Sequence, residues 1–368
     1  MEYLWNRIRP ADRNADAVIF LTSVDVVGYR VAIGLIKAGS KVRVGIDSDQ
    51  IALDSQVLHD LKKRGVVSLV PFSWEDESTY SNAVQGAKTV FCVVPYHRGS
   101  VKRFHAFFDA CRKNGVNHFV KLSFYNALAS TRMNSILGAR RVDSPFRRVP
   151  LIKMHGDCDE RIMKSHAMDY TILSTTHLMS DPAVYQRRNI MSDAPKFYSA
   201  SAGKGVNYVS PNDVAAAAVR VLVNPKDHRR VGYTLTGPTH ITDDQVAGLL
   251  SKVMNKTVDY VDVAPKDYGH FCCIYSSAES TTDNTMVDLT STEAKNVDLV
   301  PKGSTEKKQG GPPEWLMDDL VEQEILKATG VEVKFLSKDF EKLCGRPAET
   351  FNEYLDAKSE MAPAELLI

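Results

Sequence analysis

The stretch from Ala17 to Asp47 constrains the fold of this chain more than any other. It begins with an apolar run, residues 17–21, which predicts a buried strand followed by a short turn. Apolar residues then recur at helical spacing as far as Gly39, a residue that suits the left-handed position after a helix. Residues 41–46 predict a second strand, which Asp47 follows. Strand, tight turn, helix, strand and acidic residue is the order of a dinucleotide-binding βαβ unit.

Strands and helices continue to alternate beyond this unit. Further strands are predicted at residues 66–70, 89–94, 117–123 and 170–174, and helices at 51–63, 74–85, 101–113 and 153–165. This alternation predicts an α/β fold, in which a doubly wound parallel sheet is covered by helices on both faces. Later segments predict helices at 211–222, 242–254, 313–328, 337–343 and 350–355, and extended segments at 206–208, 232–237 and 257–263. Ser210 is the expected N-cap of the first of these helices. The polar stretch 276–312 is expected to be a long surface loop or partly disordered.

Composition excludes several classes of protein. The formal net charge is +1, so no overall field favours nucleic acid or an anionic membrane, and no apolar run is long enough to span a bilayer. Six scattered cysteines lack a CxxC pair or a metal-ligand spacing, which predicts free thiols, no metal site, and a reducing intracellular compartment, either cytoplasmic or organellar. Residues 1–16 mix three arginines with three acidic residues, so a plain N-terminal arm is favoured over a short organelle-targeting segment.

Four later blocks carry a family resemblance. They read MDYTILSTTHLMSD (168–181), YVSPNDVAAAAVRVL (208–222), YTLTGPTHITDDQVAGLLSKVMNKTVDYVDV (233–263) and LCGRPAETFNEYL (343–355). In this order they resemble the NmrA-like family of atypical short-chain dehydrogenases/reductases. The resemblance implies a Rossmann domain over residues 17–175, with a returning contribution from about 205–238. It also implies a smaller mixed C-terminal domain over 176–368, with a nicotinamide cofactor in the crevice between the two.

The resemblance leaves two functions open. Some members of the family reduce quinones, aldehydes or dyes, which predicts an NAD(P)-dependent oxidoreductase acting on a small carbonyl or quinone. Other members bind the dinucleotide without known turnover, which predicts a redox sensor, a regulator or an accessory subunit with a protein partner. Fold alone does not choose between them.

The phosphate-binding turn departs from the family's G-x-x-G-x-x-G pattern. The matching positions are Thr22, Asp25 and Gly28, so only the third glycine is present. Asp25, followed by Val26, stands at the helix N-terminus, where backbone N–H groups usually meet the pyrophosphate. Its carboxylate is expected either to occupy those donors or to repel the phosphates.

The remaining cofactor contacts are expected at the carboxyl ends of the strands. Asp47 is suited to the ribose hydroxyls and would repel a 2′-phosphate, which favours NAD(H) over NADP(H); a solvated loop residue is the alternative. Val94, Pro95, Ser123 and Thr175 end neighbouring strands and are expected to line the crevice.

Catalytic candidates are less well defined. The Tyr-x-x-x-Lys pair of standard reductases occurs only as Tyr354 with Lys358, far from the expected nicotinamide. His155 is a candidate proton donor, because it and Lys153 lie near the position of a helix-start lysine in several NmrA-like proteins, and Tyr125 follows the fifth strand. His177 is a further candidate for facing the pocket. Purely structural roles remain the alternative for these residues.

Overall fold

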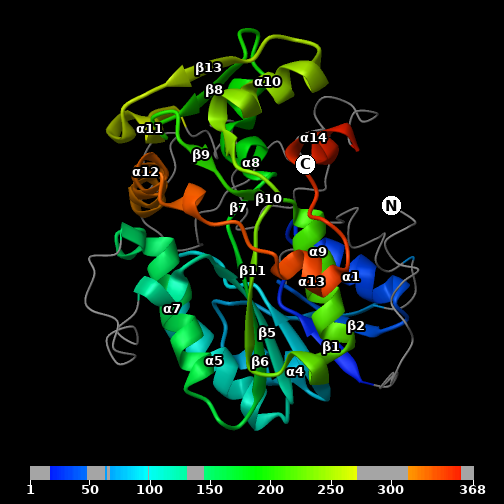
Figure 1. Ribbon diagram of the computed structural model, residues 1–368. Coiled ribbons are helices and arrows are strands. Elements are labelled where there is room, and N and C mark those ends of the chain that lie inside the picture. Colours follow the sequence, from blue (N-terminus) through cyan, green and yellow to red (C-terminus); the bar gives the residue numbers. More distant parts are fainter. Residues whose placement is uncertain are drawn as a thin grey trace.

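A seven-stranded parallel sheet forms the centre of the computed structural model, which describes residues 17–47, 63, 67–97, 99–130, 145–271 and 314–357 (Figure 1). The strand order is β11-β6-β5-β4-β1-β2-β3. The strands are β1 (Val18–Leu21), β2 (Lys41–Ile46), β3 (Val67–Pro71), β4 (Ala87–Cys92), β5 (His118–Phe124), β6 (Asp169–Thr175) and β11 (Val231–Leu235). The order reverses between β1 and β4, where doubly wound sheets bind their ligands. The predicted Rossmann-like α/β fold is confirmed.

Helices cover both faces of this sheet. One face packs against α1 (Gly28–Lys37) and α9 (Pro211–Val223), and the other against α4 (Ser78–Val84), α5 (Ser100–Lys113) and α7 (Pro150–Met163). Successive residues of β1 point to opposite faces, so Leu21 joins the first core and Phe20 the second. Around Phe72, four aromatic rings lie with centroids 5.3–5.6 Å away, which gives the second core its largest packed cluster.

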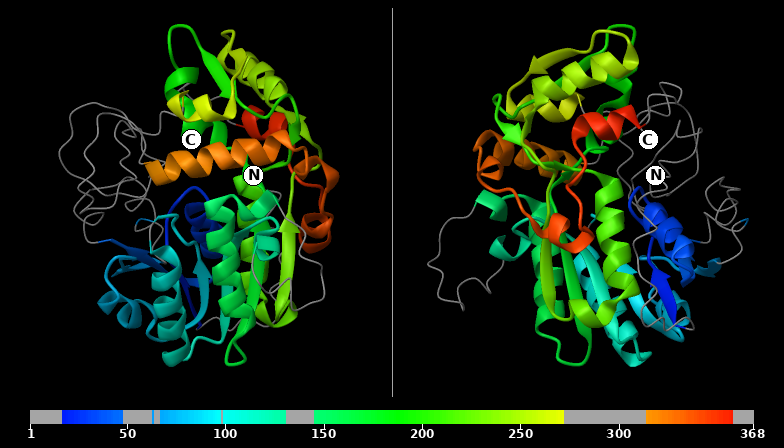
Figure 2. Two further views of the ribbon diagram at one scale, coloured as in Figure 1. Left: turned by 90° about the vertical axis from the view of Figure 1, so that its left-hand side faces the viewer. Right: turned by 45° about the vertical axis from the view of Figure 1, so that its right-hand side comes forward.

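A smaller mixed unit lies over the carboxyl ends of the strands, at the top of Figure 1. It contains β7 (His177–Leu178), α8 (Asp181–Ile190), β8 (Lys196–Ser199), β9 (Gly205–Val206), β10 (Tyr208–Val209), β12 (Ile241–Thr242), α10 (Asp243–Met254), β13 (Asp259–Asp262), α11 (Pro265–Phe271), α12 (Glu314–Ala328) and α14 (Phe351–Asp356). Helix α13 (Asp339–Cys344) instead packs on α9 and β11, so the chain returns to the central sheet at this helix. Within the small unit, helix α12 lies on the side that faces the sheet (Figure 2).

Most predicted elements are confirmed, and the expected Ser210 cap accepts a hydrogen bond from the Asn212 N–H. The predicted helix 74–85 is wrong at its start, since α4 begins only at Ser78. The acidic residues before it form a turn instead, in which the Asp76 carboxylate accepts from the Ser78 N–H at 2.9 Å. Helix α8 and strand β8 were not predicted. The N-terminal arm, the predicted helix 51–63 except for its last residue, and the polar loop 276–312 lie outside the described residues.

The turn between β1 and α1 requires glycine at position 28. A Cβ on Gly28 would stand 2.3 Å from the Ser23 carbonyl oxygen, whereas one on Gly248, an exposed position inside α10, would contact nothing within 4 Å. We expect Gly28→Ala to lower the free energy of unfolding by about 2 kcal/mol or more, because the turn must open. Gly248→Ala should raise it by about 0.5–1 kcal/mol. Urea unfolding measures both, and equal effects would contradict the steric argument.

Candidate functional site

The Asp25 carboxylate occupies the N-terminus of α1. Its Oδ1 accepts hydrogen bonds from the Gly28 N–H at 2.6 Å and the Val27 N–H at 3.1 Å. These are the donors that a dinucleotide phosphate would normally use at this position. Burial raises the pKa of the Asp25 carboxyl, while the Gly28 and Val27 bonds and the nearby Arg30 charge act in the opposite direction.

Thr22 closes the other side of the same turn. Its Oγ1 donates to the Val93 carbonyl at 3.1 Å and accepts from the Val93 N–H at 3.0 Å. The buried hydroxyl therefore ties the end of β1 to the end of β4 across the switch point of the sheet. Val26 is also buried, and its carbonyl accepts from Arg30, which reaches Asn212 on α9.

The other predicted cofactor contacts follow their strands as expected from the topology. Asp47 comes directly after β2, and the buried Val94 lies just beyond β4. The Pro95 carbonyl accepts from the Ser100 hydroxyl at 2.6 Å, which fixes the start of α5. These residues lie at the carboxyl edge of the sheet, on either side of the point where the strand order reverses.

Ser123, Tyr125 and Thr175 are brought together at the ends of β5 and β6. The Thr175 hydroxyl donates to the Ser123 carbonyl at 3.3 Å, and the Tyr125 N–H donates to the Thr175 carbonyl at 2.7 Å. The Tyr125 ring stacks on Phe335, with centroids 5.6 Å apart and an angle of 6° between the planes. The chain that returns from the small unit therefore covers this part of the sheet edge.

A buried ionic cluster connects β5 to α7. Lys121 Nζ lies 2.8 Å from Asp159 Oδ1 and 3.0 Å from His155 Nδ1, and the Ser123 hydroxyl donates to the second carboxylate oxygen of Asp159 at 2.5 Å. The Lys121 and Asp159 side chains are only 0% and 1% exposed, so neither charge can be solvated by water. Sequence reasoning found His155 and Ser123 but missed Lys121 and Asp159. The available signal was a lysine between the apolar residues Val120 and Leu122 in the strand NHFVKLS.

The two catalytic candidates on α7, His155 and Lys153, lie in different environments. Burial and the Lys121 charge hold the pKa of His155 well below its usual range, and burial raises the pKa of Asp159. Lys153, two residues before His155 on α7, has an exposed side chain. The structure therefore places His155 against the sheet and Lys153 on the solvent side of the helix.

Helix α12 is fixed to the start of α7 by a buried carboxylate. Asp319 Oδ1 accepts from the Leu151 N–H at 2.7 Å, in the first turn of α7, where an acceptor satisfies a free backbone donor. Its second oxygen accepts from Gln323 at 2.6 Å. Burial raises the pKa of Asp319 to about 6. Figure 2 shows α12 crossing above the strand ends.

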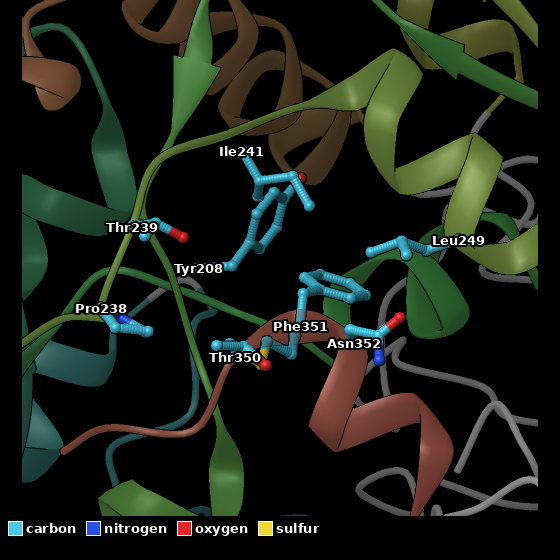
Figure 3. A pocket seen from close by; sticks show the side chains of 9 residues that line it. Tyr208, Pro238, Thr239, Ile241, Leu249, Thr350, Phe351 and Asn352 are labelled. Carbon is cyan, nitrogen blue, oxygen red and sulfur yellow. The ribbon is translucent and has the colours of Figure 1, made fainter.

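A small, mainly apolar pocket of about 180 Å³ lies inside the small unit (Figure 3). Ile241, Leu249 and Phe351 form much of its wall, with Thr239 and Asn352 as polar neighbours. The Tyr208 ring is part of the lining and also contacts Phe351, at a centroid distance of 5.4 Å.

Comparison with known proteins identifies the family. The profile described as NAD(P)H-binding matches residues 27–225, more than half of the chain. The chain belongs to the NAD(P)H-binding family. The predicted relationship to NmrA-like atypical short-chain dehydrogenases/reductases is thereby confirmed.

Two curated relatives of this NAD(P)H-binding protein are named as oxidoreductases. It is 26% identical over 215 residues to festuclavine dehydrogenase of Aspergillus fumigatus, covering 55% of this chain and 66% of that one. It is also 26% identical over 210 residues to the NAD(P)H azoreductase of Xenophilus azovorans, covering 57% and 66%. The chain thus spans just under two thirds of the length of these curated relatives.

The fold extends over nearly the whole chain. The NADPH complex of the NADPH-dependent quinone oxidoreductase of Escherichia coli superposes with a TM-score of 0.64 at 19% identity, covering 92% of this chain and 99% of that one. Within the part of the NAD(P)H-binding protein that the structure describes, no cluster of three or more histidine, cysteine or acidic side chains is arranged to hold a metal. No helix among those same residues has the length and apolar character needed to cross a bilayer.

The Lys121–Asp159 pair generates a stability prediction. We expect Lys121→Met to lower the free energy of unfolding by about 3–5 kcal/mol, because it leaves a buried carboxylate without its counter-charge. Arg112→Met, which breaks the exposed Arg112–Asp109 pair, should cost less than about 1 kcal/mol. Urea unfolding compares the two variants, and equal losses would show that the buried pair is not needed for stability.

The raised pKa of Asp319 generates a pH prediction. Since the folded pKa is about 6 and the usual value is 3.8, protonation favours the folded state, and this contribution is lost as pH rises through 6. Between pH 5 and pH 7.5 the loss is about 1 kcal/mol. Asp319→Asn keeps an oxygen acceptor for the Leu151 N–H but cannot titrate. Its unfolding free energy should therefore fall less than that of the wild type over this range, and parallel curves would refute the assignment.

Proposed function

We propose that this protein is an NAD(P)H-dependent oxidoreductase that reduces a small carbonyl or quinone. The observation that carries the proposal is the reversal of strand order between β1 and β4, which brings the glycine-constrained turn and the end of β4 to one crevice. The oxidoreductase relatives support the same reading. In this proposal residues 17–175 bind the dinucleotide, and residues 176–368 bind the substrate. We place the protein in a reducing compartment of the cell, since its four described cysteines are free.

The described residues fit a dinucleotide except at the pyrophosphate. Gly28 permits the close approach of backbone that this turn needs. Asp47 would accept hydrogen bonds from the adenosine ribose, so NAD(H) is favoured over NADP(H). The ends of β4, β5 and β6 would hold the nicotinamide, which supplies a hydride when bound. The exception is Asp25, whose carboxylate already occupies two phosphate donors.

A non-catalytic role is the second candidate, and Asp25 is the observation that favours it. A carboxylate beside the pyrophosphate repels it by about 1–4 kcal/mol at intermediate dielectric. Such a protein would bind dinucleotide weakly and act as a redox sensor, a regulator or an accessory subunit. It would need no small-molecule substrate but would need a protein partner.

Titration with NADH and NADPH separates the candidates. Protein fluorescence and melting temperature would be followed with each dinucleotide up to millimolar concentration. The proposal expects saturable binding of NADH, weaker binding of NADPH, and oxidation of NADH when menadione or para-nitrobenzaldehyde is added. Saturable binding without turnover would support the sensor, and no binding of either dinucleotide would reject both candidates.

Asp25→Asn should tighten dinucleotide binding by about 10-fold or more, because it removes the like charge while the amide oxygen can still accept from the N–H groups.

Wild-type binding should strengthen as pH falls, since the raised pKa lets the Asp25 carboxyl become neutral at a higher pH than an ordinary aspartate would. The variant should not show this dependence.

Asp25→Ala is the matched control, because it removes both the charge and the hydrogen bonds. It should bind more tightly than the wild type but lose about 1 kcal/mol of stability. Unchanged affinity in both variants would show that the carboxylate turns away when phosphate binds.

A further inference from the structure

Unpaired polar atoms gather in the buried region just beyond β6. His177 Nε2 lies 3.3 Å from Glu332 Oε2, and these side chains are only 4% and 1% exposed. Among the described residues, His177 Nε2 and both carboxylate oxygens of Glu332 are buried without a hydrogen bond of good geometry. The hydroxyls of Thr176 and Ser180, on the same segment, are buried and unpaired as well. Such a concentration is unusual in a folded interior and indicates that a polar group is still to be bound there.

His177 lies just beyond the carboxyl end of β6, the sheet edge at which the proposed function places the nicotinamide. Its ring meets Phe124, the last residue of β5, edge to face with centroids 5.5 Å apart. Its backbone is fixed because β7 pairs with β10. Two further carboxyl groups interact electrostatically with the ring, Asp181 at the start of α8 and Asp319 on α12. Among these three carboxyl groups, Glu332 is the one that contacts the ring directly.

Two other buried histidines show what a structural role looks like in this protein. His118 bonds the Thr171 hydroxyl at 2.8 Å, and His228 bonds the Tyr233 hydroxyl at 2.8 Å. Both lie toward the amino ends of the strands, and both have neutral partners. His177 differs in its position, in the direct contact of its ring with a carboxylate and in its unsatisfied polar atoms. A carboxylate that faces one imidazole nitrogen fixes the ring and leaves the other nitrogen for proton transfer.

We propose that His177 donates the proton in the reduction assigned above and that Glu332 is the residue that positions its imidazole ring. This inference rests on the proposed function. As the carbonyl carbon accepts the hydride of NAD(P)H, its C=O π bond breaks and the oxygen takes the proton from a ring nitrogen of His177. The products are the alcohol, NAD(P)⁺ and a neutral imidazole, which regains its proton from water. His155 is poorly suited to this step, because the adjacent Lys121 ammonium disfavours a second positive charge.

The test compares His177→Gln with His118→Gln, since both side chains are only 4% exposed. His118 begins β5 at the amino end of the central strands, whereas His177 follows the carboxyl end of β6. With para-nitrobenzaldehyde, His177→Gln should lower kcat about 100-fold or more, the usual effect of losing a general acid. With menadione the loss should be much smaller, because a hydroquinone anion is a far weaker base than an alkoxide. His118→Gln should leave both rates within about twofold, and equal loss on both acceptors for His177→Gln would overturn the proposal.

A second readout does not depend on turnover. In nitrogen-15 NMR of histidine-labelled protein, the ring resonances of His177 should move when NADH is added, while those of His118 stay in place. Glu332→Gln should change the His177 resonances without NADH and leave the NADH dissociation constant within about twofold. His177 resonances that ignore both NADH and Glu332→Gln would overturn the proposal even if no acceptor is reduced.

The two proposals fail in different ways. Absence of NADH and NADPH binding to the wild type rejects the oxidoreductase and the proton donor together. Binding and turnover that persist at the wild-type rate in His177→Gln reject the proton donor alone.

Discussion

The close approach of the Ser23 carbonyl to Gly28 is the constraint on which the candidate site depends. The chain turns sharply here after β1, and the first N–H groups of α1 lie at the carboxyl edge of the sheet, next to the switch point. The Thr22 hydroxyl then fixes this turn to Val93 beyond β4. The two halves of the sheet are thus joined at the point where their order reverses. The same tight turn also brings the Asp25 carboxylate within reach of the donors it occupies.

The buried Lys121–Asp159 pair gives the other side of the crevice a comparable rigidity. Apolar packing holds α7 on the sheet without specifying how far the helix slides along it. A short ion pair with hydrogen bonds to Ser123 and His155 adds that specification, because a displaced helix would leave charges unpaired in the interior. Asp319 then ties α12 to the first turn of α7. Polar contacts therefore connect the sheet to the small unit: Lys121 on β5 holds α7, and α7 in turn holds α12.

The sequence predicted the sheet well because each strand is a short apolar run, and because apolar residues recur at helical spacing in the segments between the strands. Occupation of the helix donors by Asp25 was one of its two alternatives for this residue, and that contact was within reach of sequence reasoning because it joins residues only three apart. It did not predict Lys121 with Asp159 or His177 with Glu332, which are separated by 38 and 155 positions and meet only after folding. The start of α4 was wrong because the acidic residues before it were counted as helical, although Asp76 turns the chain before Ser78. Contacts between residues close in the sequence could therefore be predicted, whereas pairs that only the fold brings together could not.

The hydrogen bonds and the charge of Asp25 determine how tightly a protein with this carboxylate can bind a dinucleotide. Replacing the carboxylate by a phosphate on the Val27 and Gly28 donors exchanges one set of charge-assisted hydrogen bonds for another, so that exchange is close to neutral. The unfavourable part is the remaining repulsion of about 1–4 kcal/mol. A dinucleotide that would otherwise bind near 1 μM is then weakened to between about 10 μM and 1 mM. A carboxylate with a raised pKa can reduce this cost by taking up a proton on binding. If the dinucleotide binds at this turn as proposed, its affinity is coupled to proton uptake by Asp25, a coupling that the family's glycine at the same position could not provide.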